Sequence, residues 1–273
     1  MLRLPRGARY TPGRPSTLTA QRPGAARAAG HYRDRVPQPR EQNPPPVQRL
    51  RIRYAKRGRL RFTSHRDFSR AFERAVFRAR IPMAYSSGFN PHPRISYAGA
   101  SPTGAASEAE YLEIALAETT DPDEVRLALV ESLPDGLDVL EVVVAGPGAL
   151  ADRLEASRWL VVVALPEEEV AAAVATYLAT EAVPVERMTK KGLRHFDSRE
   201  PVVALTVGPH EAGPGWSELD LTLRHGVPAV RPDDVLSGLA TVAGLRPGTP
   251  PLLTRLRQGP LDPATGEVGD PLG

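Results

Sequence analysis

The chain has 273 residues, with 35 basic and 32 acidic side chains, so its formal net charge is only +3. It contains no cysteine, which excludes a disulfide scaffold, a thiolate zinc or iron–sulfur site and a cysteine nucleophile. Its longest aliphatic run, Leu160 to Leu165, is far shorter than the roughly 20 residues that span a bilayer. The N-terminus carries no apolar leader, so we expect a cytoplasmic protein without membrane contact.

The small net charge hides an uneven distribution. Residues 1–46 carry nine Arg against two acids, and residues 47–96 carry thirteen basic residues against Asp67 and Glu73. These segments therefore have net charges of +7 and +11, whereas residues 97–273, with thirteen basic and twenty-eight acidic side chains, have −15. Such a separation indicates a region that faces a polyanion, on an otherwise acidic body.

Residues 1–46 contain nine Pro and four Gly and almost no periodic apolar pattern. Such a segment cannot bury enough apolar area to offset its ordering entropy, so we predict a disordered, Arg- and Pro-rich extension. Its arginines could gather RNA, or the segment has no function of its own. Val47, just before the first predicted strand, could also mark the native start of translation.

The first ordered element is a predicted strand at 49–54, in which Leu50, Ile52 and Tyr54 alternate with three arginines. After a turn centred on Gly58, a helix is predicted from Ser64, a favourable N-cap, to Arg80. A second strand is predicted at 83–85, before a loop and a short strand-like piece at 95–98. A third strand at 110–116, a helix at 121–132 and a fourth strand at 137–144 follow. This order is the ferredoxin-like βαββαβ unit.

The second half repeats that order less clearly. Its predicted elements are a strand at 158–165, a helix at 166–180, a strand at 185–189, a charged turn at 190–200, strands at 201–207 and 218–223, a helix at 232–243 and a strand at 252–256. We therefore expect an α+β protein with two tandem ferredoxin-like (βαββαβ) halves, 47–150 and 151–258. The Pro- and Gly-rich acidic tail, 259–273, is predicted to be flexible.

A basic cluster is the strongest local feature. By alternation, the arginines of the first strand share one face, and Arg66, Arg70, Arg74 and Arg78 recur every four residues along the helix. Arginine forks fit phosphate groups, so a nucleic-acid interface is predicted at Arg51, Arg53, Arg59, Arg61 and Arg70. The alternative is a face that is solvated or meets the protein's own acidic surface. Tyr54 and Phe62 fall on the apolar side and are expected in the core.

The loop Gly88-Phe89-Asn90-Pro91-His92-Pro93-Arg94 is stiffened by two X-Pro bonds. A stiff loop holds its polar side chains in place, which favours binding by Asn90, His92 and Arg94, although a rigid structural turn explains it as well. A third basic segment, with Lys190, Lys191 and Arg194, is predicted either to contact phosphates or to form a solvated turn.

Candidate catalytic groups are few. His65 and His92 could form an acid–base couple, and Asp67 or Asp197 could act as a nucleophile, although Asp67 also fits a capping role at the helix start. No spacing of His, Asp and Glu predicts a metal site, and no phosphate-binding or nucleophile-elbow motif is present.

Several strings in residues 47–110 resemble one family, the bacterial radical SAM-linked proteins. They are RIRYAKRGRLRF at 51–62, SHRD at 64–67, GFNPHPRIS at 88–96 and SEAEY at 107–111. The family usually has Leu-Ser-His-Leu-Asp where this chain has Thr63-Ser64-His65-Arg66-Asp67. The departure adds an arginine and leaves His65 and Asp67 in place.

The resemblance implies an accessory role beside a radical SAM protein with a cobalamin-type domain. The iron–sulfur cluster, SAM and cobalamin would then reside on that partner, with no cofactor on this chain. Our leading hypothesis is a non-catalytic protein that presents tRNA or rRNA to the partner enzyme. The alternatives are an RNA-modifying or RNA-cleaving enzyme in its own right, and a protein–protein adaptor without RNA contact.

Overall fold

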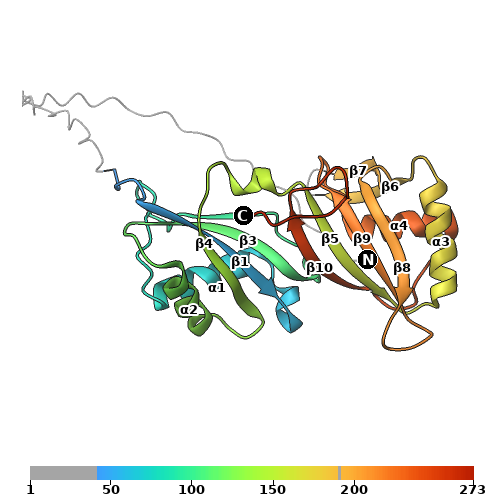
Figure 1. The fold of residues 1–273 in the computed structure, drawn as a ribbon, viewed down its shortest axis with the longest axis horizontal. Coiled ribbons are helices and arrows are strands. Elements are labelled where there is room, and N and C mark those ends of the chain that lie inside the picture. Colours follow the sequence, from blue (N-terminus) through green and yellow to red (C-terminus); the bar gives the residue numbers. More distant parts are fainter. Residues whose placement is uncertain (1–41, 190–191) are drawn as a thin grey trace, which may run out of the picture. The chain divides into compact units, whose positions relative to one another are not determined.

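The computed structural model describes residues 42–189 and 192–273, so nearly all of the extension predicted at 1–46 lies outside the described part of the chain. The described residues form an α+β structure with one eight-stranded, mostly antiparallel sheet, a two-stranded hairpin and four α-helices (Figure 1). None of these helices is long and apolar enough to cross a membrane.

The first half follows the predicted order of elements. Strand β1 pairs antiparallel with β3 on one side and β4 on the other, and β2 pairs antiparallel with β3. The elements are β1 (Gln48–Lys56), α1 (His65–Arg78), β2 (Ile95–Ala98), β3 (Ala106–Leu116), α2 (Pro122–Ser132) and β4 (Leu137–Val144).

The second half has the same order with one hairpin inserted. Here β5 lies between β10 and β9, and β8 forms the edge next to β9, all antiparallel. The elements are β5 (Ala156–Val163), α3 (Glu167–Ala179), β6 (Pro184–Thr189), β7 (Gly192–Asp197), β8 (Val202–Pro209), β9 (Ser217–Arg224), α4 (Pro232–Ala243) and β10 (Leu252–Gly259).

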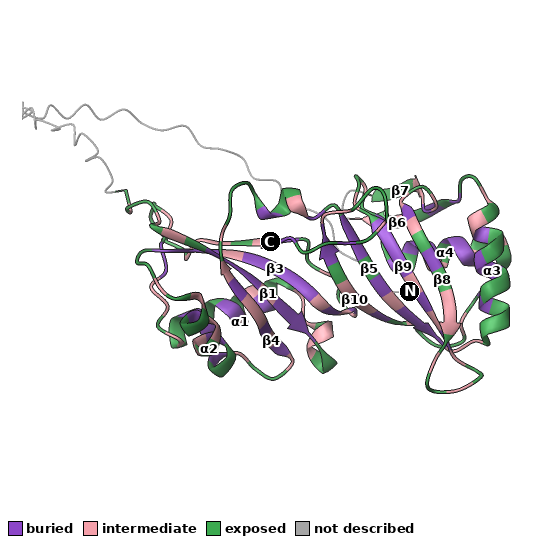
Figure 2. Ribbon diagram, in the orientation of Figure 1, coloured by how far each residue is buried: buried purple, intermediate pink, exposed green. Residues whose placement is uncertain are grey.

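Each half buries a separate core between its helices and one sheet face (Figure 2). In the first half, Leu50 and Ile52 of β1 pack with Phe72 of α1, as the alternation predicts. In the second, Tyr177 of α3 and Leu239 of α4 lie among the buried side chains of β5 and β9. The capping predictions also hold, since Ser64 Oγ accepts the Asp67 amide and α2 begins with Asp121 and Pro122.

The two halves share one sheet because β10 pairs with β3. The pairing is parallel and short, with Thr254 opposite Ala106 and Arg255 opposite Ser107. Strand β10 lies along the same edge of β3 as β2, but it pairs with residues nearer the start of β3. The last strand of the second half thereby joins the sheet of the first.

The sheet face opposite α1 and α2 is partly covered by other segments. The linker between the halves crosses it and contains a short 3-10 helix, η2 (Leu150–Arg153). Leu150 and Leu154 of this linker pack with Tyr111 of β3 and with Leu272 near the C-terminus.

The expectation of a flexible acidic tail at 259–273 is therefore corrected. Val268 and Leu272 are buried, the Gly269 N–H donates to Pro260 O at 2.8 Å, and Arg153 Nη1 donates to Pro271 O at 2.9 Å. Apolar contacts and backbone hydrogen bonds hold the segment against the fold, which its Pro- and Gly-rich composition did not reveal.

Four local predictions also differ from the structure. The strand expected at 83–85 is reduced to isolated bridges at Met83 and Tyr85, and the turn at Gly58 is a 3-10 helix, η1 (Gly58–Phe62). Phe62 is 59% exposed, because this helix breaks the alternation that assigned it to the core. The predicted turn at 190–200 contains strand β7, which pairs with β6.

Candidate nucleic-acid interface

Arg51, predicted to contact phosphate, is completely buried. The linker covers it, and its Nη2 donates to Gly146 O at 3.1 Å and Gly148 O at 2.7 Å. Its Nε donates to Glu113 on β3 at 3.3 Å. Arg51 therefore holds the linker on the sheet and is unavailable to a nucleic acid, so its assignment as a binding residue is wrong.

The neighbouring arginines of β1 also have partners within the protein. Arg53 Nε donates to Glu108 O at 2.9 Å, and Arg57 pairs with Glu108 and, at 2.7 Å, with Asp138. The basic face of β1 thus bonds to backbone carbonyl and carboxylate oxygens of the protein itself, and Arg57, just beyond the strand, bonds to two carboxylates. Arg59 remains exposed beyond the strand, and the Arg61 guanidinium lies 4.7 Å from the centre of the Phe62 ring.

The outer face of α1 has a different character. Arg66, Arg70 and Arg74 are exposed, and none of the ion pairs among the described residues involves them. Arg78 donates to Ser132 O at 3.2 Å. On the same side of the helix, Phe77 is 82% exposed. This set of residues, Arg66, Arg70, Arg74, Phe77 and Arg78, is called the α1 face below.

A shallow hollow of about 620 Å³ lies on the α1 face. It is lined by Arg70, Glu73, Arg74, Phe77 and Arg78, so three cations and one carboxylate surround an exposed aromatic ring. Guanidinium groups beside an accessible ring provide both a phosphate ligand and a stacking surface for a base.

The Gly88–Arg94 loop lies at the edge of the first half and is held mainly by its flanks. Ser86 N–H donates to His92 O at 2.9 Å, His92 N–H donates to Ser86 Oγ at 3.0 Å, and Arg94 Nε donates to Tyr85 O at 3.2 Å. Asn90 and His92 are exposed and Arg94 is half-buried. The backbone is thus fixed while these side chains stay accessible.

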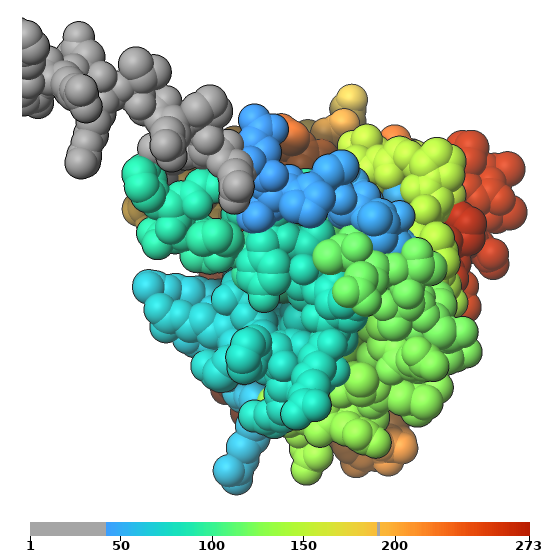
Figure 3. Space-filling view, turned by 90° about the vertical axis from the view of Figure 1, so that its left-hand side faces the viewer, coloured from blue at the N-terminus to red at the C-terminus, as the bar shows by residue number. Residues whose placement is uncertain are grey.

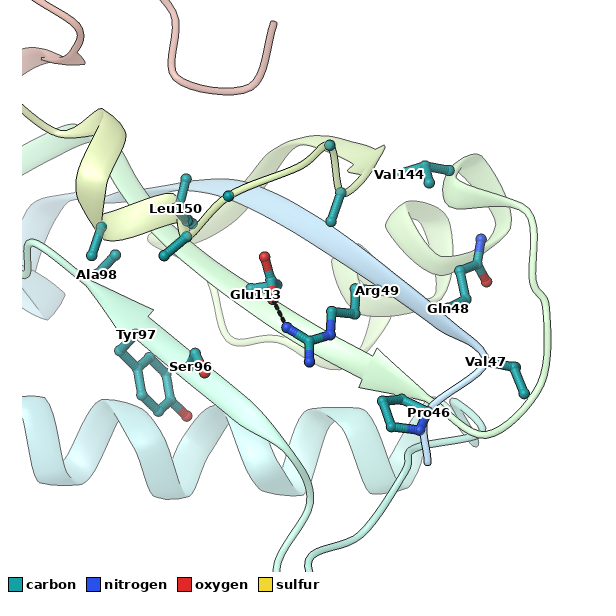
Figure 4. A pocket seen from close by; sticks show the side chains of 15 residues that line it. Pro46, Val47, Gln48, Arg49, Ser96, Tyr97, Ala98, Glu113, Val144 and Leu150 are labelled. Atoms are coloured by element: carbon teal, nitrogen blue, oxygen red, sulfur yellow. Dashed lines mark hydrogen bonds and ion pairs between the residues drawn. The ribbon is translucent and has the colours of Figure 1, made fainter. Parts of the chain in front are cut away.

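A groove lies on the sheet face opposite α1, between β1, β2 and the linker (Figure 4). Its volume is about 800 Å³. Arg49 and Glu113 stand in it, joined at 3.2 Å, with Ser96 and Tyr97 on one side (Figure 4). A smaller hollow of about 280 Å³ shares Arg49, Ser96 and Glu113 and extends to His92 and Arg94. Figure 3 shows the blue start of β1 beside the yellow-green linker at this end of the molecule.

The structure brings no catalytic pair together among the described candidates. His65 packs edge-on against Tyr97 with ring centres 5.0 Å apart, and no hydrogen bond or ring contact in the described residues joins it to His92. Asp67 accepts a hydrogen bond from Ser64 Oγ at 2.7 Å, which fits its capping role. Burial raises the pKa of Tyr97 to about 12, so this phenol stays protonated.

Asp197 has a structural position as well. Its carboxylate accepts the Val183 and Arg199 amides at 2.7 and 2.9 Å and shapes the turn after β7. Arg194 is exposed on β7, while Lys190 and Lys191 lie outside the described residues. Among residues 42–189 and 192–273, no group of three or more His, Asp and Glu side chains is placed to share a metal ion.

Two residues of these surfaces were not found from the sequence. Phe77 lies outside the apolar pattern of its helix, and that mismatch is the one signal that could have marked it as exposed. Arg49 belonged to the predicted basic face of the first strand but was not named as a contact residue. Alternation alone does not distinguish it from Arg51, which is buried.

Comparison with known proteins places the chain in a family. No curated protein matches it. A family model described as "Uncharacterized protein conserved in bacteria (DUF2344)" matches residues 49–232, a range that begins in β1, includes the α1 face and most of the groove lining, and ends at the start of α4. The chain therefore belongs to the DUF2344 family of bacterial proteins.

Proposed function

We propose that this protein binds RNA through the α1 face and acts as an accessory subunit of a radical SAM enzyme that modifies tRNA or rRNA. The observation that carries the proposal is the exposed Phe77 ring among unpaired arginines. Its neighbours Arg70 and Arg74 have no acidic partner among the described residues, apart from the adjacent Glu73 that lines the same hollow.

The chemistry of this face suits an unpaired RNA segment. Arginine forks bind phosphate oxygens, and an accessible aromatic ring stacks on a base that is not already stacked in a helix. Arg59 and Arg61 of η1 and the Gly88–Arg94 loop are further cationic elements of the same half. Under this proposal they extend the contact along the RNA backbone.

The fold proposal is that each half is a ferredoxin-like unit. The strands lie in the order β4-β1-β3-β2 in the first half and β10-β5-β9-β8 in the second. When the strands of each half are numbered along the chain without the β6–β7 hairpin, both orders place the fourth strand beside the first, the first beside the third and the third beside the second. This shared arrangement supports the proposal. The β6–β7 hairpin is then an insertion in the second unit.

The radical SAM partner rests on the sequence resemblance. In this proposal the partner carries the cluster, SAM and cobalamin, and this chain positions the substrate. The absence of cysteine is compatible with that division, because the chain has no thiolate with which to hold an iron–sulfur cluster.

The test is RNA binding by the full chain, measured by fluorescence anisotropy over a range of salt concentrations. The double variant Arg70→Glu/Arg74→Glu should bind more than tenfold more weakly, and the slope of log affinity against log salt should fall by about one for each lost phosphate contact. The control, Arg224→Glu/Arg257→Glu, makes the same charge change at exposed positions of the second half.

Two results would overturn the proposal. One is an absence of salt-dependent RNA binding, with or without the partner enzyme. The other is an equal loss in the α1-face and control variants, which would show a general charge effect. A partner complex that survives nuclease and forms equally with the α1-face variant would instead favour a pure adaptor.

A further inference from the structure

The groove on the opposite face of the first half has its own chemistry, separate from the α1 face. Alternation along β1 directs Leu50 and Ile52 towards α1 and Arg49 and Arg51 away from it, so the groove and the α1 face lie on the two sides of one sheet layer. A ligand in the groove would therefore contact none of the residues of the α1 face, although it would share His92 and Arg94 of the Gly88–Arg94 loop with an RNA that extends beyond that face.

Arg49 is held in position by a buried support. Arg51, with no exposed surface, binds Glu113 at 3.3 Å, and Glu113, 14% exposed, binds Arg49 at 3.2 Å. The Arg49 side chain itself is 61% exposed. Because Glu113 is shared by two arginines, this group of three carries a net positive charge, and Arg49 presents its remaining donors to the groove.

A second cation lies next to this group. The smaller hollow is lined by Arg49, His92 and Arg94, and Glu113 is the one acidic side chain among the described residues that line either space. Arg94 uses Nε for Tyr85 O and keeps its two terminal nitrogens for other acceptors. The polar end of the combined groove is therefore suited to an anion with several oxygens.

Apolar side chains line the groove on both sides of Arg49 and Glu113. Val47 and Val144 lie on one side of this pair, and Ala98 and Leu150 lie on the other (Figure 4). A volume of about 800 Å³ falls within the range of small-molecule sites and is larger than a free phosphate requires.

We propose that this groove binds a nucleotide, with its phosphate at Arg49 and Arg94 and its base and sugar against Val47 and Val144, which are 63% and 58% exposed. A phosphate would neutralise the net positive group, and a flat, weakly polar ring would be buried against the two valines, so both the polar and the apolar parts of the groove would be used. The nucleotide is either free or the phosphorylated end of an RNA strand.

Calorimetric titration of the full chain with adenosine and uridine 5′-monophosphates tests the assignment. We expect one nucleotide per chain, with adenosine and inorganic phosphate each binding at least about tenfold more weakly, since each lacks one half of the contact. Arg49→Ala and Arg94→Ala should each weaken binding by about tenfold to a hundredfold. Arg224→Ala, an exposed position in the second half, should leave it unchanged.

A short RNA with either a 5′-phosphate or a 5′-hydroxyl distinguishes the two sources. If the phosphorylated strand alone competes with the mononucleotide, the ligand is a strand end; if neither competes, it is a free nucleotide. Arg70→Glu/Arg74→Glu should bind mononucleotides normally, so failure of the RNA proposal leaves this one intact. The inference is overturned if neither nucleotide binds at millimolar concentration, if adenosine binds as well as its monophosphate, or if Arg49→Ala and Arg94→Ala both bind like the wild type.

Discussion

Arg255 of β10 forms a buried ion pair with Glu110 of β3, across the junction where the two halves share a sheet. Their side chains are 4% and 2% exposed. Arg255 also donates to Gly99 O at 2.6 Å and to Ser107 Oγ at 3.3 Å, and its guanidinium lies 5.5 Å from the Trp159 ring centre. The contact between the halves thus depends on a buried polar network as well as on apolar packing.

Replacement of Arg255 by Met should lower the free energy of unfolding by about 3–5 kcal/mol, because it leaves the buried Glu110 carboxylate without its main partner. Urea denaturation followed by circular dichroism measures the loss. Arg257→Met, at an exposed position of the same strand, should change stability by about 0.5 kcal/mol or less. Equal effects of the two variants would refute a role of the buried pair.

Stability should decrease in acid because of Glu110. Burial alone would raise the pKa of this carboxyl, but Arg255, Ser107 and Lys56 together lower it below its usual value of 4.5. The folded state therefore binds fewer protons than the unfolded state, and its advantage is lost as the pH falls from 4.5 through the folded pKa. The unfolding free energy, measured from about pH 3 to 6, should fall less steeply in Glu110→Gln than in the wild type. Parallel curves would contradict the assignment.

Arg51→Met should destabilise the protein by about 2–4 kcal/mol and release the linker, because three hydrogen bonds of a buried guanidinium are lost. Hydrogen exchange at residues 145–151 should increase more than in the body of the sheet. Arg59→Met, an exposed change nearby, should leave both quantities unchanged. A variant that loses RNA binding at unaltered stability would restore Arg51 as a contact residue.

Phe77→Ala should leave stability within about 0.5 kcal/mol of the wild type, since its ring is 82% exposed. RNA affinity should fall by about 1–3 kcal/mol, the usual contribution of one stacked base. Phe72→Ala, five residues earlier and 1% exposed, is the contrasting change and should cost about 3–5 kcal/mol of stability. Unchanged RNA affinity in Phe77→Ala would exclude stacking on this ring.

Ser64→Ala should destabilise the protein by about 1 kcal/mol through the loss of the α1 cap. Asp67→Asn should have a smaller effect on stability. Because Asp67 is assigned as a capping residue and not a nucleophile, RNA incubated with Asp67→Asn should have the same composition as RNA incubated with the wild type. Mass spectrometry of RNA incubated with the protein checks the second point. Cleavage or isomerised uridine produced by the wild type but not by Asp67→Asn would favour the enzymatic alternative.

The sequence was sufficient for elements whose signals are local. The alternation of Leu50 and Ile52 placed one face of β1 in the core, and Ser64 and Pro122 marked the starts of α1 and α2. A strand that lacks apolar alternation, β7, was predicted as a turn, because its pairing with β6 is not encoded in its own composition.

The candidate site was less accessible to the same reasoning. Alternation tells which side of a strand a residue faces, but not what covers that side. The linker that covers Arg51 follows β1 by about a hundred residues in sequence, so the burial of Arg51 depends on distant contacts. The exposure of Phe77 is different, because Phe77 lies outside the buried positions of α1 and that local mismatch was the available signal.

The parallel pairing of β10 with β3 has a consequence for biosynthesis. Every other strand precedes β10 in the chain, yet β10 lies inside the sheet between β3 and β5. During synthesis, β3 therefore lacks its partner at Ala106 and Ser107, and the nearby Glu110 carboxylate lacks Arg255. The ribosome adds that partner segment about 145 residues later. Until then the nascent first half has an open strand edge and an unneutralised acid, so it depends on β10 to reach its final stability.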